Sequence, residues 1–143
     1  MITDAAGVPL VVQTGPANQR DEDRVLPMLE ALPPLTDTQG NRQDRPKAMQ
    51  GDAGYGFPWT ALLVWLLGIV PMLKPRTKRG QPAEHGSGMG RTRYVVERTL
   101  AWFAAFRRIR ICYERTGAHF QGFHELAACV ICARKLRHAR RRF

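Results

Sequence analysis

The stretch RTRYVVERTLAWFAAFRRIRICYE, residues 91–114, has the clearest helical pattern in the chain. At 100° per residue, one broad stripe collects its apolar side chains, which are Val95, Val96, Thr99, Trp102, Phe103, Phe106, Ile109 and Tyr113. The opposite face carries Arg93, Glu97, Ala101, Ala104 and Arg108. We therefore expect one long helix that presents a lone carboxylate, Glu97, on a face suited to an anionic partner. An ordinary solvated helix face is the alternative.

The charge of the chain is strongly asymmetric. Its 143 residues carry a formal net charge of +10, and the sequence pI is about 10.6. Residues 1–73 contain 5 Lys and Arg against 8 Asp and Glu, whereas residues 74–143 contain 17 against 4. A basic half of this size predicts a polyanionic partner, with nucleic acid favoured over an acidic membrane surface. The odd number of cysteines, three, argues against a disulfide scaffold, and we expect a cytoplasmic protein.

The first third of the chain predicts short elements joined by loops. Residues 1–14 have the pattern of a hairpin, because the turn residues DAAG at 4–7 precede a β-branched apolar run. A short helix is expected over residues 24–32, because Pro33 and Pro34 follow and end it. Residues 35–47 are polar, and we expect them to form a long loop.

Residues 48–73 predict a strand, a helix and a second strand. The first strand, residues 48–52, ends on Asp52 and is followed by the glycine-rich turn AGYG. The helix is expected over residues 57–67, and the second strand over residues 69–73. A carboxylate at the C-terminal end of a strand, before such a turn, is where α/β folds place their chemistry. Asp52 is therefore the second candidate site residue, with an ordinary turn aspartate as the alternative.

The same region has a second interpretation as a membrane anchor. Residues 53–73 run for 21 residues without a charge, and four cations follow between residues 74 and 79. Glycines and prolines interrupt the run and leave about ten residues of clean helix. We therefore favour a fully buried helix and strand over a membrane span.

The C-terminal half predicts a loop, two helices and a basic tail. Residues 74–90 form a basic loop whose glycines would let a ligand approach the backbone closely, with His85 as a weak candidate base. Residues 116–133 form a second helix that is apolar nearly all round, so we expect it to be buried. Cys129 and Cys132 lie within it, and core packing is favoured over a zinc site. The tail, residues 134–143, is able to touch phosphates.

Five segments together resemble a known family. They are DAAGVPLVVQTGPANQRDED at 4–23, GDAGY at 51–55, HGSGMG at 85–90, VVERTLAWFAAFRRIRICYER at 95–115 and FHELAACVICARKL at 123–136. They resemble the C-terminal part of the DDE transposases of bacterial insertion sequences, most of all the IS-five-like group. The similarity covers nearly the whole chain.

This resemblance implies an α/β fold of the ribonuclease-H-like type, incomplete at its N-terminal strand or strands, with two long C-terminal helices. Within a single domain, residues 1–143, it implies a hairpin at 1–14, a strand–helix–strand unit at 48–73 and a helical pair at 91–137. The implied function is DNA transposition, in which metal-dependent phosphoryl transfer cleaves and joins DNA strands.

The resemblance also implies roles for particular residues. Asp52 matches the second catalytic Asp and Glu97 the catalytic Glu, and both would bind Mg²⁺ or Mn²⁺. Arg93 matches a basic position of the signature around the Glu. The cations expected to neutralise DNA phosphates are Arg93, Arg98, Arg107, Arg108 and Arg110.

The chain also departs from the family pattern. The first catalytic Asp of the family precedes the hairpin, and Asp4, a turn residue, does not match it. Ala104 stands where some relatives have a Lys, Gly56 replaces a common Asp, and residues 60–67 are apolar where charges are usual. With two of three carboxylates, we expect weak metal binding and an inactive isolated chain, either a truncated remnant or the downstream frame of a two-frame element.

Several alternatives stay open at this point. The chain could be a non-catalytic DNA-binding remnant or inhibitor of the full enzyme, a metal-dependent nuclease that recruits Asp4, or a small membrane protein anchored by residues 53–73. The expected partners are DNA and either a second copy or the upstream-frame product, with no small-molecule substrate.

Overall fold

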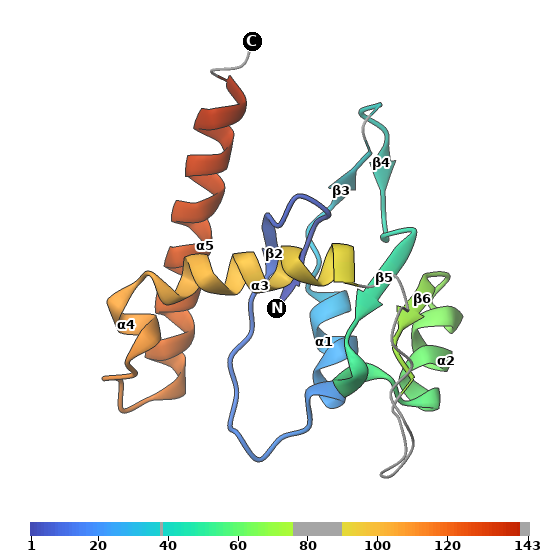
Figure 1. The fold of residues 1–143 in the computed structure, drawn as a ribbon, viewed down its shortest axis with the longest axis horizontal. Coiled ribbons are helices and arrows are strands. Elements are labelled where there is room, and N and C mark those ends of the chain that lie inside the picture. The colour runs from blue at the N-terminus through green and yellow to red at the C-terminus, as the bar shows by residue number, and fades with distance from the viewer. Residues whose placement is uncertain (38, 76–89, 141–143) are drawn as a thin grey trace. The chain divides into compact units, whose positions relative to one another are not determined.

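The computed structural model describes residues 1–37, 39–75 and 90–140, with side chains from Tyr94 onward in the last range. The fold is mixed α/β (Figure 1). It divides into two compact units, which are described separately. Unit 1 comprises Met1–Pro16 and Gly88–Phe143, and unit 2 comprises Ala17–Ser87.

Unit 2 is built around a small parallel sheet. Strands β5 (Ala48–Gly51) and β6 (Val70–Leu73) pair in parallel, with Ala48 opposite Val70 and Gly51 opposite Leu73. Helix α2 (Pro58–Leu66) connects them, as a crossover between parallel strands requires. The strand, helix and strand therefore lie within the ranges that the sequence indicated.

A short helical segment and the crossover helix make the core of unit 2. The 3-10 turn η1 (Asp21–Arg24) continues into α1 (Val25–Glu30). Val25 of α1, Val64 of α2 and Ile69, which precedes β6, are buried against one another. This cluster holds α1 and α2 on the sheet.

The expectation of a long loop over residues 35–47 is wrong, because this segment contains a second hairpin. Strands β3 (Leu35–Thr36) and β4 (Arg42–Gln43) pair antiparallel. Asp37 builds the turn, since its Oδ1 accepts hydrogen bonds from the amides of Gln39 at 2.9 Å and Asn41 at 2.8 Å. The amide of Asn41 is the main reason why the pKa of Asp37 is lowered. Local turn chemistry thus outweighs the polar composition.

The expectation that residues 57–73 are fully buried is also wrong. Only Thr60 and Val64 of α2 are buried, whereas Trp59 is 69% exposed and Trp65 is 64% exposed. A two-stranded sheet and a six-residue helix are too small to cover every side of an apolar helix. No helix in the described part of the chain is long and apolar enough to cross a membrane.

Unit 1 combines a hairpin with three helices. Strands β1 (Ile2–Thr3) and β2 (Pro9–Val11) pair antiparallel. Asp4 forms the turn, because its Oδ1 accepts the amides of Ala6 at 2.9 Å and Val8 at 2.7 Å. Helices α3 (Gly90–Ala104), α4 (Arg107–Arg110) and α5 (Gly117–Arg140) follow.

The prediction of one continuous helix over residues 91–114 is wrong. Helix α3 ends at Ala104, and Phe106 has an extended backbone with φ −85° and ψ 120°. The short helix α4 then begins in a new direction (Figure 1). Phe106 and Ile109 both pack against the core around Phe103. The break brings these two apolar side chains to one core, and this packing outweighs the helical periodicity of the sequence.

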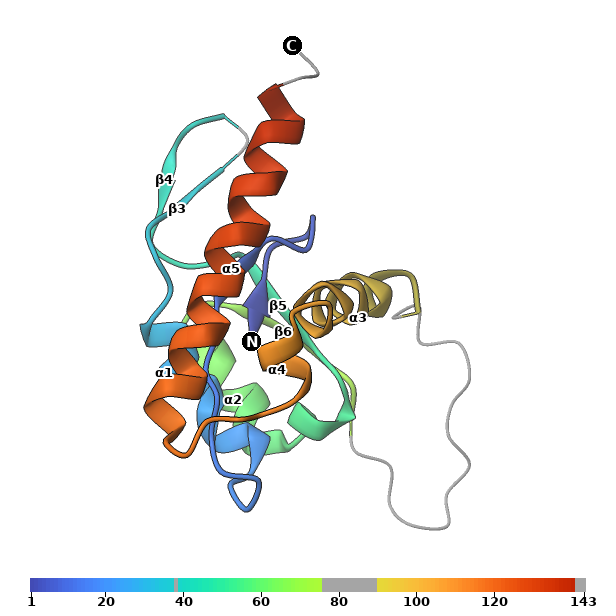
Figure 2. The same ribbon diagram turned by 90° about the vertical axis from the view of Figure 1, so that its left-hand side faces the viewer.

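The prediction of a buried second helix is wrong as well. Helix α5 begins at Gly117 and extends to Arg140. Helix α3 crosses α5 in Figure 1 and is seen nearly end-on beside it in Figure 2. Only Ala127 and Ile131 are buried, against Phe103, while Leu126 is 63% exposed. Cys129 is exposed as well, so core packing does not describe it. Two helices, α3 and α4, and a short hairpin pack against α5 and leave much of its surface exposed.

Candidate functional site

Asp52 lies directly after strand β5 of unit 2, where the sequence placed it. It caps the 3-10 turn η2 (Ala53–Tyr55), because its Oδ1 accepts a hydrogen bond of 2.9 Å from the amide of Gly54. The side chain is exposed, and Oδ2 has no hydrogen-bond partner among the described residues. One oxygen of Asp52 is therefore oriented by the backbone, while the other is available to a cation.

The backbone around Asp52 is closely packed. A Cβ atom on Gly51 would lie 2.8 Å from Cδ2 of Leu73 on the paired strand and 3.3 Å from Tyr55. Burial, followed by the charges of Asp21 and Asp52, raises the pKa of Tyr55. Gly51 thus lets the end of β5 approach β6 and Tyr55, and this contact fixes where Asp52 leaves the sheet.

Glu97 lies on the exposed face of α3 in unit 1, together with Ala101 and Ala104. For these three residues the sequence predicted the exposed face correctly. Arg108, expected one further turn along, instead belongs to α4. The predicted Arg93 is part of α3, but its side chain lies outside the described residues. So do His85 and most of the segment 74–90, for which the sequence predicted a glycine-rich loop.

The two residues after Glu97 attach α3 to the turn of the β1–β2 hairpin. The guanidinium of Arg98 donates 2.8 Å to the carbonyl of Ala6, and the hydroxyl of Thr99 donates 2.8 Å to the carbonyl of Gly7. Sequence reasoning missed this anchor because the partners are 92 residues apart. It holds the part of α3 that carries Glu97.

Arg98 also interacts with two aromatic side chains of its own helix. Its guanidinium lies 4.9 Å from the ring centroid of Tyr94 and 5.1 Å from that of Trp102, and it donates 2.6 Å to the Tyr94 hydroxyl. The Nε atom is buried without a partner among the described residues. This side chain, which the sequence assigned to DNA, is therefore occupied by contacts within unit 1.

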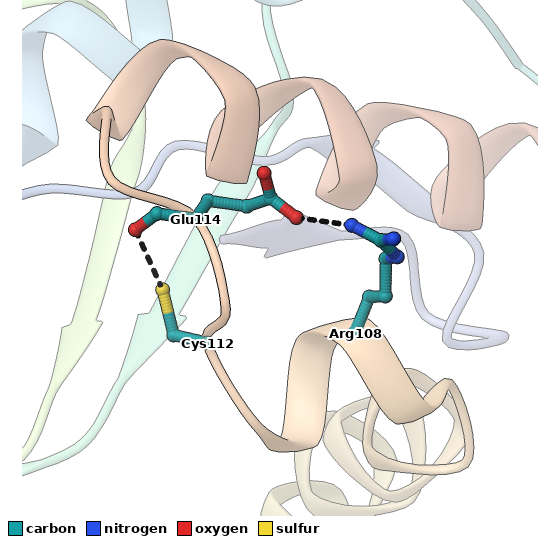
Figure 3. A network of polar contacts seen from close by, with 3 residues as sticks. All are labelled: Arg108, Cys112 and Glu114. Atoms are coloured by element: carbon teal, nitrogen blue, oxygen red, sulfur yellow. Dashed lines mark hydrogen bonds and ion pairs between the residues drawn. The ribbon is translucent and has the colours of Figure 1, made fainter.

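The arginines of α4 differ in the contacts that they make with other side chains. Arg108 pairs with Glu114 at 2.5 Å and lies 4.8 Å from the ring centroid of Phe123, while Cys112 donates to the Glu114 carbonyl at 3.7 Å (Figure 3). Arg107 lies 5.8 Å from the ring centroid of Tyr113. All three arginines of α4, the third being Arg110, are exposed.

A surface groove of about 680 Å³ runs along α5 beside this ion pair. Arg108, Glu114, His119, Phe123 and Leu126 contribute to its lining. The groove forms because α4 turns back toward α5, and the sequence pattern of either helix alone contains no sign of it.

The two candidate carboxylates belong to different units, Asp52 to unit 2 and Glu97 to unit 1. In the ranges 1–37, 39–75 and 90–140, no group of three or more His, Cys, Asp or Glu side chains is placed to hold a metal ion. The metal site predicted from Asp52 and Glu97 therefore stays a prediction.

Comparison with known proteins identifies the family. Residues 1–132 match the family described as the transposase DDE domain. The chain belongs to this family. It is also 38% identical over 139 residues to the Burkholderia cepacia protein named "Putative transposase for insertion sequence element IS402". No solved structure matches the chain.

The match to the Burkholderia protein covers 97% of this chain and 64% of the relative, so the chain spans less than two thirds of that relative's length. The resemblance to bacterial insertion-sequence DDE transposases is confirmed, whereas the IS-five-like group stays a prediction. Domains of the DDE transposase family generally use divalent metal ions.

Proposed function

We propose that this DDE transposase domain contributes to DNA transposition by metal-dependent phosphoryl transfer. The match of residues 1–132 to the family carries this proposal. The basic composition supports it, because a net charge of +10 favours a polyanionic partner. We further propose a ribonuclease-H-like fold, for which the parallel β5–α2–β6 unit provides support.

Asp52 and Glu97 are the residues that we propose to hold the metal ions. Both side chains are exposed, and Asp52 has one carboxylate oxygen without a protein partner. Carboxylate oxygens are hard ligands of the kind that Mg²⁺ and Mn²⁺ prefer, so the donor chemistry fits. The backbone of both residues is also held in place, Asp52 at a closely packed strand end and Glu97 beside the hairpin contact of α3.

The bound ions would activate the attacking hydroxyl and stabilise the leaving 3′-oxygen in an in-line displacement. The reaction also requires negative charge where the ions bind and positive charge along the DNA, and side chains of this chain supply both. Asp52 and Glu97 hold negative charge at defined positions, and the amide of Gly54 orients the Asp52 carboxylate. The arginines that we propose to neutralise DNA phosphates are Arg93, Arg107, Arg108 and Arg110.

A plasmid assay with the full chain tests the proposal. The sequence predicts weak metal binding and an inactive isolated chain, so any Mn²⁺-dependent nicking of supercoiled DNA or joining of labelled ends should be abolished by Asp52→Asn and by Glu97→Gln. Asp44→Asn and Glu30→Gln are matched controls, because both carboxylates are exposed and neither is assigned to the site. Binding of Mn²⁺, followed by electron paramagnetic resonance, gives a second readout that does not depend on turnover.

The outcomes separate catalysis from simple DNA binding. Metal binding that falls in the two site variants and not in the controls supports the assigned ligands. If the two site variants and the two control variants showed the same cleavage or metal binding, Asp52 and Glu97 would not be the metal ligands. DNA binding with neither Mn²⁺ binding nor metal-dependent activity would favour a non-catalytic role.

A further inference from the structure

The C-terminal end of α5 carries a row of arginines that no contact among the described residues explains. Arg134, Arg137 and Arg140 are exposed, and none of them makes an ion pair or hydrogen bond in the part of the chain that the structure describes. This end of α5 extends beyond the hairpin, α3 and α4 of the same unit in both views (Figures 1 and 2).

Lys135 lies between Arg134 and Arg137 in the sequence and marks the point beyond which α5 no longer packs against the core of unit 1. Its ammonium lies 4.3 Å from the ring centroid of Trp102 on α3. Ile131, one turn earlier, is buried in the core of unit 1. The side of α5 that carries Ile131 and Lys135 therefore faces α3, while the three arginines are left exposed.

The spacing of these arginines is unfavourable for an isolated helix. Side chains three residues apart are neighbours on a helix, and like charges at such spacing repel each other. No Asp or Glu occurs in α5 after Glu125, so no carboxylate of this helix lies within one turn of the arginines. The negative end of the helix dipole offsets part of the repulsion. A bound polyanion would offset more of it, because its phosphates neutralise the arginine charges.

We propose that Arg134, Arg137 and Arg140 form a DNA-binding surface, at which α5 contacts phosphates of the DNA backbone. The row covers about 9 Å of helix axis at 1.5 Å per residue, a length over which duplex DNA presents about five phosphate charges. The choice of DNA as the polyanion rests on the proposed function. The arginines of α4 are a less available cluster, because Arg108 is paired with Glu114 and Arg107 lies beside Tyr113.

The salt dependence of DNA binding tests this surface. Binding of the full chain to a labelled duplex of arbitrary sequence is followed by fluorescence anisotropy between about 50 and 200 mM salt. Each lost phosphate contact reduces the slope of log K against log salt by about 0.9. We expect the triple variant Arg134→Gln, Arg137→Gln, Arg140→Gln to reduce the slope by about 2 to 3.

Two further variants control for charge and folding. Arg20→Gln, Arg42→Gln, Lys47→Gln removes the same charge from exposed positions of unit 2 and is expected to keep the slope. Replacing the three α5 arginines by Lys keeps the charge and is expected to keep the slope as well. Far-ultraviolet circular dichroism of each variant shows whether α5 is retained.

The results either support or overturn the proposal. An unchanged slope in the α5 variant, or an equal loss in the unit 2 variant, overturns it. So does a wild-type chain that binds vesicles containing phosphatidylserine and does not bind DNA. Failure of the proposed function would look different. DNA binding would keep its dependence on the α5 arginines, while neither Mn²⁺ binding nor metal-dependent cleavage would be detected.

Discussion

The hydroxyl of Thr99 donates a hydrogen bond of 2.8 Å to the carbonyl oxygen of Gly7, and the Thr99 side chain is completely buried. This contact joins the turn of the β1–β2 hairpin to the middle of α3. Glu97 lies two residues before Thr99 on the same helix. The hairpin turn therefore determines how the backbone that carries Glu97 is held within unit 1.

Replacing Gly7 by Ala should destabilise the protein by about 2 to 3 kcal/mol. Gly7 has φ +79°, and a Cβ atom would lie 2.8 Å from Oγ1 of Thr99 and 3.1 Å from Nη2 of Arg98. Urea unfolding followed by circular dichroism measures the change. Gly122→Ala is the control, because a Cβ atom there meets nothing within 4 Å, and it should be neutral or stabilising. Equal stability of the two variants would contradict the tight contact.

Replacing Thr99 by Val should cost about 1 to 3 kcal/mol, because the Gly7 carbonyl loses its buried donor while the side-chain volume is kept. Thr99→Ser keeps the hydroxyl and should recover most of the loss. Thr36→Val, on the exposed side of β3, should have little effect in the same thermal unfolding experiment. A Val variant as stable as the Ser variant would show that the hydrogen bond does not hold α3.

Arg98→Gln should lower stability by about 1 to 2 kcal/mol, because it removes the contacts of the guanidinium with the Ala6 carbonyl and two aromatic rings. It should leave the salt dependence of DNA binding unchanged. Arg110→Gln, on exposed α4, should keep the stability and reduce the salt dependence of DNA binding. Thermal unfolding and anisotropy titrations on the two variants check this pairing. If Arg98→Gln kept full stability and reduced the slope, Arg98 would be a DNA contact, as the sequence suggested.

Cys132 should react with iodoacetamide more slowly than Cys112 and Cys129. Its thiol lies 3.7 Å from the Pro9 carbonyl, and the other two cysteines are exposed. Burial, followed by the neighbouring Cys129 and then Asp4, raises the pKa of Cys132 above its ordinary value of 9.0. Mass spectrometry of partially labelled protein gives the order of reaction. Labelling of all three cysteines at one rate would contradict it.

The same raised pKa predicts the direction of a pH effect on stability. Above pH 9.0 the unfolded chain loses the Cys132 proton while the folded chain keeps it, so folding becomes less favourable as the pH rises through the folded pKa. Cys132→Ser should remove this contribution. Urea titrations at a series of alkaline pH values compare the two proteins.

Much of the local structure followed from short-range patterns. The strand before Asp52, the crossover helix and the turn built by Asp4 lie where the sequence indicated, because turn residues and periodicity act over a few neighbours. The β3–β4 hairpin was missed, although Asp37 is a turn residue of the same kind. There, the polar composition of the segment concealed the signal.

The sequence by itself determined the family, the positions of Asp52 and Glu97 on their own elements, and the excess of positive charge. Only the tertiary structure decided the break before Phe106, the exposure of most of α5, and the attachment of Arg98 and Thr99 to the hairpin turn. The physical reason is the range of the interactions. A helical pattern reports which residues share a face, whereas burial, strand pairing and hydrogen bonds across 92 residues depend on which surfaces the folded chain brings together.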